Sequence, residues 1–258
     1  MQTSQPTDNP LQRLGHERYL RSFAADSARL SAAAGQDVDA EVPYCTGWRV
    51  ADLLVHAGQV WAHKAAIIAQ RLPPGDGEPP EAPEPGPDVD LTAWHDEQRR
   101  RLVDAFAGAD PDERVWTWAD DDQTVRFWGR RMAHEALIHR IDAEAATGQR
   151  TGADDDLVLD GIDEVLGVYI GSVWWATPPG GHGETVRFET AGRQWRSVVE
   201  AQRVTCSRDP GPADATVRGE PFDLLLWLWG RADDDVVSVE GDREAFATLR
   251  ALLRRATT

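Results

Sequence analysis

The stretch RMAHEALIHRIDAE, residues 131–144, predicts a helix with polar, chemically capable side chains along one edge of its buried face. A helical repeat of about 100° per residue places Glu135, His139 and Asp142 on one stripe. The adjoining stripe is apolar and consists of Leu137, Ile138, Ile141 and Ala145. Arg131 lies one turn before Glu135 on the same side. Charged groups at the border of a core are uncommon, so this helix is the first candidate for a site.

A second predicted helix, from about Trp48 to Arg71 behind an N-cap at Thr46, carries a matching polar stripe. The members of that stripe are Asp52, His56, Gln59 and His63. If the two helices are neighbours in a bundle, His56 can face Glu135 and His139. Two imidazoles and one carboxylate form the ligand set of an open divalent-metal site, which leaves positions for water or substrate.

Spacing alone leaves other interpretations open. A Glu and a His four residues apart on a helix are usually a solvated pair that contributes only ~0.2–0.5 kcal/mol. His134 points about 100° away from Glu135, so we expect it to be structural. We expect His63, two turns beyond His56, to be at most a wall of the cavity. Asp142 either orients a ligand, as outer carboxylates of metal sites do, or is a solvated or capping residue.

Composition restricts the classes of partner. Among 258 residues, 44 are acidic and 27 are basic, which gives a net charge of −17. Such a charge repels phosphate backbones and anionic lipid, so we expect neither nucleic acid nor a membrane as a partner. No segment resembles a signal peptide, and no apolar run reaches the ~18 residues of a membrane span. We therefore expect a cytoplasmic protein, with its oligomeric state left open.

Single residue types exclude several mechanisms. Lys64 is the only lysine, so no P-loop is present and any Schiff base would have to form there. Cys45 and Cys206 are the only cysteines and lie far apart, which excludes zinc-finger spacing and a disulfide framework. We expect Cys45 to be a packed thiol.

Periodicity divides the chain into two predicted domains, residues 1–179 and 180–258. The first domain is expected to be a helical bundle and the second a small α+β domain, so the fold class is mainly α with a C-terminal α+β domain. The expected helices are 10–34, 48–71, 90–106, 127–146, 154–175, 221–231 and 243–256, and the expected strands are 185–191, 194–202, 203–209, 215–220 and 235–242. A Pro- and Glu-rich linker occupies residues 72–90.

Two motifs carry a resemblance to a known family. Residues 42–63, VPYCTGWRVADLLVHAGQVWAH, and residues 115–144, which end in RRMAHEALIHRIDAE, resemble the mycothiol-dependent maleylpyruvate isomerase family. Residues 213–233, ADATVRGEPFDLLLWLWGRAD, resemble the second domain of that family. The resemblance covers nearly the whole chain. It implies a DinB-like up-down four-helix bundle followed by a small sterol-carrier-like domain.

The resemblance also implies a function. The metal triad of the family corresponds to His56, Glu135 and His139, with zinc as the expected metal and mycothiol as the expected thiol cofactor. The implied activity is cis–trans isomerisation, or thiol S-transfer, on a small electrophilic substrate. A metal-held thiol loses its proton readily, which makes it a nucleophile.

Two arginines are candidates for binding the substrate or acting in catalysis. Arg231 is the first candidate for a carboxylate clamp, with an ion pair to the acidic residues 233–235 as the alternative. Arg131 is the second candidate, with an ion pair to Glu135 as the alternative.

Two other functions of the protein stay open. One is a zinc hydrolase that activates water, with Asp52 or Asp142 as base. The other is a non-catalytic protein that binds thiol and metal.

Overall fold

The computed structural model describes residues 13–75, 81–119, 121–172 and 177–257. The chain forms two compact units, one of Gly15–Gly152 and one that contains Ala153–Thr258. We call them the helical unit and the sheet unit. Within the described residues, no helix combines the length and the apolar character that crossing a membrane requires.

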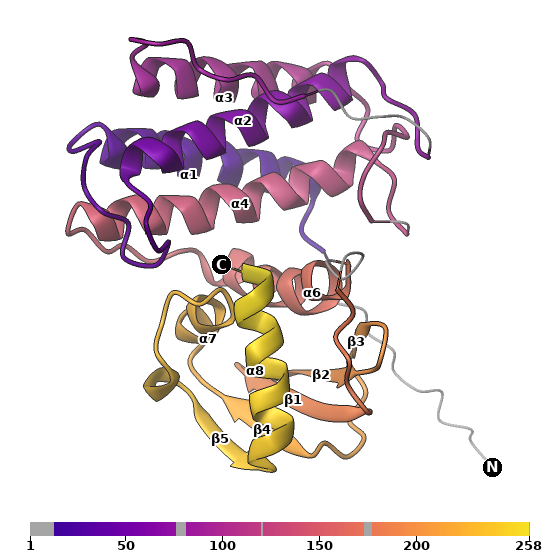
Figure 1. The fold of residues 1–258 in the computed structure, drawn as a ribbon. Coiled ribbons are helices and arrows are strands. Elements are labelled where there is room, and N and C mark those ends of the chain that lie inside the picture. Colours follow the sequence, from indigo (N-terminus) through magenta and orange to yellow (C-terminus); the bar gives the residue numbers. More distant parts are fainter. Residues whose placement is uncertain (1–12, 76–80, 120, 173–176, 258) are drawn as a thin grey trace. The chain divides into compact units, whose positions relative to one another are not determined.

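The helical unit is a bundle of four long helices, as predicted (Figure 1). They are α1 (His16–Ala34), α2 (Val50–Ala69), α3 (Leu91–Ala107) and α4 (Val125–Ala146). Helix α1 packs mainly on α4 and α2 mainly on α3, while α2 also contacts α4. Edge-on aromatic contacts fill the core, with the rings of Phe23 and Trp61 5.0 Å apart and those of Phe23 and Phe106 6.4 Å apart. The contact of α2 with α4 brings the two polar stripes together.

Side-chain caps begin two of these helices. The Asp90 side chain accepts a hydrogen bond from Ala93 N at 3.0 Å, and Thr124 accepts one from Phe127 N at 3.3 Å. The predicted N-cap at Thr46 is wrong, because residues 42–48 close a loop in which Val42 N donates to Trp48 O at 2.9 Å. The helix instead starts after Arg49, whose backbone N donates to Asp52 Oδ2 at 2.8 Å.

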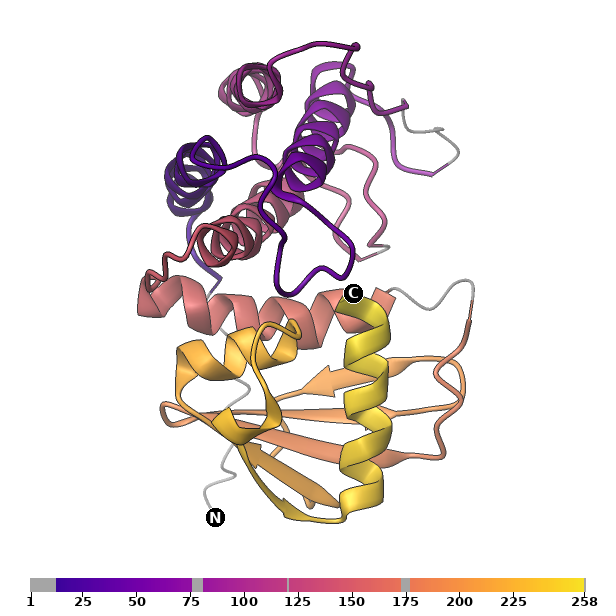
Figure 2. The same cartoon turned by 60° about the vertical axis from the view of Figure 1, so that its left-hand side comes forward.

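The sheet unit combines a five-stranded sheet with helices (Figure 2). Its elements are α5 (Asp155–Glu164), the π-helical turn η1 (Val165–Tyr169), α6 (Ile170–Ser172), β1 (Glu184–Thr190), β2 (Arg193–Val199), β3 (Val204–Ser207), β4 (Ala215–Arg218), α7 (Pro221–Leu228), the 3-10 turn η2 (Asp234–Val236), β5 (Ser238–Gly241) and α8 (Arg243–Thr257). The strand order is β3-β2-β1-β4-β5, with β1 and β4 parallel and the other pairs antiparallel. Helix α8 packs on β1 and β4.

The unit boundary differs from the expected boundary at residue 180, because α5 groups with the sheet. Helix α5 packs on α7. Its Asp163 Oδ1 accepts hydrogen bonds from Trp195 Nε1 at 3.2 Å and from Arg208 Nη2 at 2.7 Å. These tertiary contacts place the division between Gly152 and Ala153. The expected linker 72–90 has neither helix nor strand where it is described, and its residues 76–80 lie outside the described part.

Candidate metal centre

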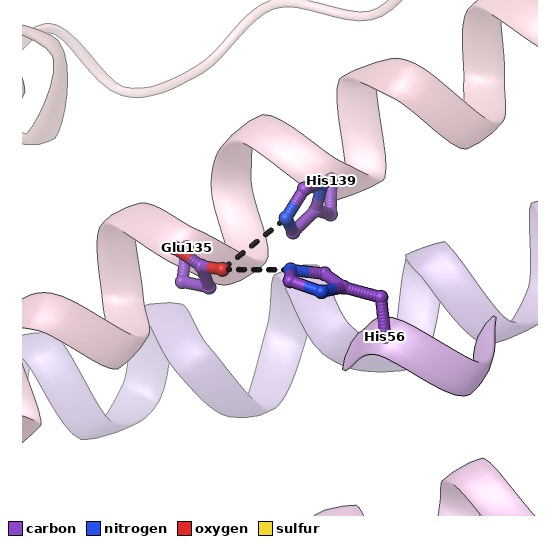
Figure 3. Close-up of side chains that lie close together, drawn as sticks. All are labelled: His56, Glu135 and His139. Atoms are coloured by element: carbon purple, nitrogen blue, oxygen red, sulfur yellow. Dashed lines mark hydrogen bonds and ion pairs between the residues drawn. The ribbon is translucent and has the colours of Figure 1, made fainter. Parts of the chain in front are cut away.

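Three side chains from α2 and α4 converge on one point (Figure 3). Glu135 and His139 leave the same face of α4 because they are one helical turn apart. Glu135 Oε1 lies 3.2 Å from His139 Nε2 and 3.4 Å from His56 Nε2. The three predicted metal ligands are therefore the residues that the fold brings together.

The spacing of these atoms fits a single divalent cation. Zinc binds imidazole nitrogen and carboxylate oxygen at ~2.0–2.2 Å, so tetrahedral donors are about 3.4 Å apart. One donor atom from each of the three residues lies within 4.8 Å of the other two. A cation drawing in the histidine nitrogens needs only small side-chain movements. The donor set of two imidazoles and one carboxylate also suits zinc and similar divalent metals.

Neighbours on α4 orient both of the candidate ligands that this helix carries. Asp142 Oδ2 lies 3.1 Å from His139 Nδ1, so Nδ1 carries a proton and Nε2 is directed to the site. Arg131 Nη2 donates to Glu135 Oε2, which leaves Oε1 facing the two histidines. Asp142 and Arg131 are both buried. Of the two roles predicted for Asp142, the structure therefore supports the orienting one.

Hydrogen bonds and nearby charges outweigh burial in setting the pKa values of both candidate ligands on α4. Burial alone raises the pKa of Glu135, but hydrogen bonds with His139 and His56 and the charge of Arg131 hold it well below its usual value. Burial alone lowers the pKa of His139, but hydrogen bonds and charges from Asp142 and Glu135 raise it to about 9. Without metal, the pair is an imidazolium and a carboxylate at neutral pH. A cation that binds there takes the place of the proton on His139 Nε2.

The site is reached from the His56 side. The side chain of His56 is 38% exposed, against 17% for Glu135 and 10% for His139. The rings of His56 and His139 lie 5.0 Å apart at 79°, and Trp48 meets His56 edge-on at 5.3 Å. A cation held by these three side chains would keep at least one coordination position open, and the exposed side of His56 would give an external ligand a route to it.

The other residues expected near the site have different places. Asp52 caps α2 and is exposed. His134 packs edge-on against Tyr19 of α1 at 6.2 Å, which matches its expected structural role. His63 pairs with Lys64 on α2 and stays outside the triad. Arg231 lies in the sheet unit, where its buried Nη1 donates to Trp229 O and Thr257 O. Its contact with a substrate stays a prediction.

Sequence reasoning missed two neighbours of the site. Cys45 Sγ donates to Asp142 Oδ2 at 3.8 Å. This thiol therefore contacts the carboxylate that orients His139, and not His139 itself. Lys64 lies within the electrostatic reach of Glu135 and Arg131. Lys64 is the only lysine in an arginine-rich chain, and the helical repeat places it beside the apolar positions Leu53 and Ala57 of α2, which is the signal that could have found it.

Comparisons with known proteins extend over both units. Residues 20–144 match the family model described as the mycothiol maleylpyruvate isomerase N-terminal domain, and residues 156–248 match the MDMPI C-terminal domain. No curated protein sequence matches the chain.

Solved structures show the same architecture. The crystal structure of a mycothiol-dependent maleylpyruvate isomerase is 14% identical, covers 89% of this chain and 95% of its own, and has a TM-score of 0.60. A histidine-to-alanine mutant of such an enzyme is 17% identical, with the same coverage and a TM-score of 0.60. At these identities the likeness establishes the fold.

Proposed function

The chain belongs to the mycothiol maleylpyruvate isomerase family, and we propose that it is a metal-dependent enzyme that uses mycothiol on a small electrophilic substrate. The observation that carries this proposal is the convergence of His56, Glu135 and His139, with one donor atom from each within 4.8 Å of the others. The proposed metal is zinc, because two imidazole nitrogens and one carboxylate oxygen with an open fourth position form a donor set that catalytic zinc takes.

The protein's own groups have defined tasks in this proposal. When bound, a divalent cation would supply the positive charge that favours the deprotonated form of a thiol. Asp142 keeps the Nδ1 proton of His139 in place, so that Nε2 serves the site. Arg131 holds one oxygen of Glu135 and adds its charge to the hydrogen bonds from His139 and His56 that keep that carboxylate ionised. His56 is the most exposed of the three, so thiol and substrate approach past its ring.

The proposed reaction follows from thiol addition. The thiolate sulfur attacks one carbon of an activated cis double bond, a C–S bond forms, and the π electrons move onto the conjugated carbonyl. Rotation about the new single bond followed by loss of the thiolate regenerates the double bond in the trans form. An adduct that takes up a proton and is released is instead the product of an S-transferase. The family assignment favours isomerisation.

A zinc hydrolase on the same residues has less support. Such an enzyme needs a base beside the metal. Of the two carboxylates named as bases, Asp52 accepts the Arg49 backbone N–H at the start of α2 and Asp142 holds His139 Nδ1. Neither carboxylate stands free beside the triad.

Thiol dependence tests the proposed function. Maleylpyruvate is offered to the purified protein with and without mycothiol, and NMR follows both geometric isomers and the free thiol. We expect isomer conversion only with mycothiol and without its consumption. Stoichiometric loss of thiol would assign an S-transferase, and turnover independent of thiol would contradict the proposal. Binding of mycothiol without any reaction would indicate a non-catalytic protein.

A further inference from the structure

A second polar cluster lies further along α2, on the side of the bundle where α2 meets α4. Lys64 Nζ lies 2.6 Å from His63 Nδ1 and 4.7 Å from the centre of the Trp128 ring of α4. Trp116 meets the His63 ring at 6.4 Å and stacks on Trp128 at 6.2 Å. The ammonium group is therefore held by an imidazole and an indole face, both of which favour the charged form of lysine.

Electrostatics connect this cluster with the metal centre. Burial lowers the pKa of Lys64 to about 8, Glu135 opposes that change and Arg131 adds to it. Burial and the nearby Lys64 lower the pKa of His63 to about 4, so His63 is neutral and its Nδ1 accepts the lysine N–H. The eight residues from His56 to Lys64 correspond to about 12 Å along a helix. Lys64 is too far along α2 to be a ligand of the same cation, yet close enough to feel the charges of α4.

Lys64 differs from two arginines in the core of the bundle. Arg140 pairs with Asp26 and Glu144, and Arg131 pairs with Glu135. No carboxylate among the described residues lies within ion-pair distance of Lys64 Nζ. One of the three ammonium protons is donated to His63 Nδ1, and the Trp128 ring adds a cation–π interaction. A half-buried charge without a counter-ion is unfavourable, and an incoming anion removes that penalty.

We propose that Lys64 is a substrate-binding residue that holds a carboxylate of the electrophile, while His63 orients its ammonium group. This inference rests on the proposed function, because it assigns one end of the substrate of that site. The ammonium group supplies the charge-assisted hydrogen bond. Trp128 is fully buried beneath Lys64, whereas the partly exposed indole of Trp116 suits the apolar body of a small unsaturated acid. The expected ligand is a small carboxylate that contains an activated double bond.

The unique lysine gives a direct readout. In full-length protein labelled with [13C]lysine, Lys64 is the only labelled side chain, so its 13Cε resonance reports this ammonium group alone. We expect a saturable shift on titration with maleate, none with the uncharged dimethyl maleate, and a much weaker effect of inorganic phosphate at equal ionic strength. The titration is repeated after chelation, so that carboxylate binding to a metal is separated from binding to Lys64.

Variants provide the quantitative test. Calorimetry should show maleate binding weakened at least about tenfold in Lys64→Met and largely retained in Lys64→Arg. Arg100→Met removes one positive charge at an exposed ion pair on α3 and should leave maleate binding unchanged. The labelled parent protein keeps the proposal testable even if Lys64→Met fails to fold.

The outcomes separate this inference from the proposed function. A Lys64 resonance that maleate leaves unchanged would overturn the inference, and equal saturable shifts with phosphate would overturn the carboxylate assignment. Absence of metal or of thiol-dependent turnover, together with an intact maleate shift, would refute the proposed function and leave Lys64 as a carboxylate site. Metal and turnover without the shift would refute the role of Lys64 alone.

Discussion

Asp142 Oδ2 lies 3.1 Å from His139 Nδ1 in the interior of the helical unit, and this contact decides which nitrogen of the histidine serves the site. The contact is one link of a series along α4, in which Arg131 holds Glu135, Glu135 meets His139 and His139 meets Asp142. Each step spans one helical turn, so a single helix supplies two ligands and the residues that orient them.

Asp142→Asn tests this orientation. The amide keeps the size of the side chain but loses the negative charge that holds the Nδ1 proton of His139. We expect metal affinity to fall about 10- to 100-fold, because the loss of a carboxylate that hydrogen-bonds a metal-bound histidine typically has an effect of this size. Competition with a chromophoric chelator measures the affinity. Asp104→Asn, at an exposed position on α3, is the control and should retain parental affinity. Equal affinity in both variants would show that Asp142 does not orient the ligand.

Arg131→Met should destabilise the metal-free protein. Glu135 still faces the His139 imidazolium but loses the charge-assisted hydrogen bond from the Arg131 guanidinium, a loss that costs about 1.5–3 kcal/mol. Urea unfolding measures the change. Adding Glu135→Gln to Arg131→Met should recover part of the loss, because the oxygen that has lost its guanidinium no longer belongs to a charged group. Arg100→Met breaks an exposed pair and should change the free energy of unfolding little. A free energy of unfolding unchanged in Arg131→Met would refute the importance of the pair.

Metal binding should depend on pH through His139. Its pKa is raised to about 9, so the metal-free protein carries a proton there at pH 7 that the cation must displace. We therefore expect release of about one proton per metal at pH 7, and affinity that rises with pH until His139 loses its proton near pH 9. Calorimetry in buffers of different ionisation enthalpy counts the protons. Affinity that is constant between pH 6 and pH 8 would show that no such proton is displaced.

Arg231→Met separates the two roles of that arginine. Its Nη1 donates to the backbone oxygens of Trp229 and Thr257, so we expect a lower melting temperature, equivalent to about 1–3 kcal/mol. A thermal melt and steady-state kinetics are measured on the same preparation. A raised KM for an anionic substrate at an unchanged melting temperature would instead assign the predicted carboxylate clamp.

The sequence was sufficient wherever a pattern is local. The predicted helix 127–146 corresponds to α4 at Val125–Ala146, since its periodicity and its cap lie within the segment itself. The triad could be predicted because one-turn spacing puts Glu135 and His139 on one face, and because the stripe on α2 carries His56, which also corresponds to the metal-binding histidine of the resembling family.

The parts that were missed depend on contacts between distant segments. Thr46 is no N-cap because the loop closes between Val42 and Trp48, and α5 belongs with the sheet because Trp195 and Arg208 bind it. The contact of Lys64 with Trp128 joins two helices in the same way. Neither the spacing of apolar residues nor the residue type indicates which distant side chain will be the partner, because that depends on how the helices and strands pack together.

The most direct test of the central claim is elemental analysis of the purified protein and its variants. We predict close to one equivalent of divalent metal, chiefly zinc, in the parent and in His182→Ala, which alters an exposed histidine of the sheet unit. We predict loss of that metal in His56→Ala and in His139→Ala, with circular dichroism confirming that both remain folded. Full metal content in both ligand variants would contradict the account.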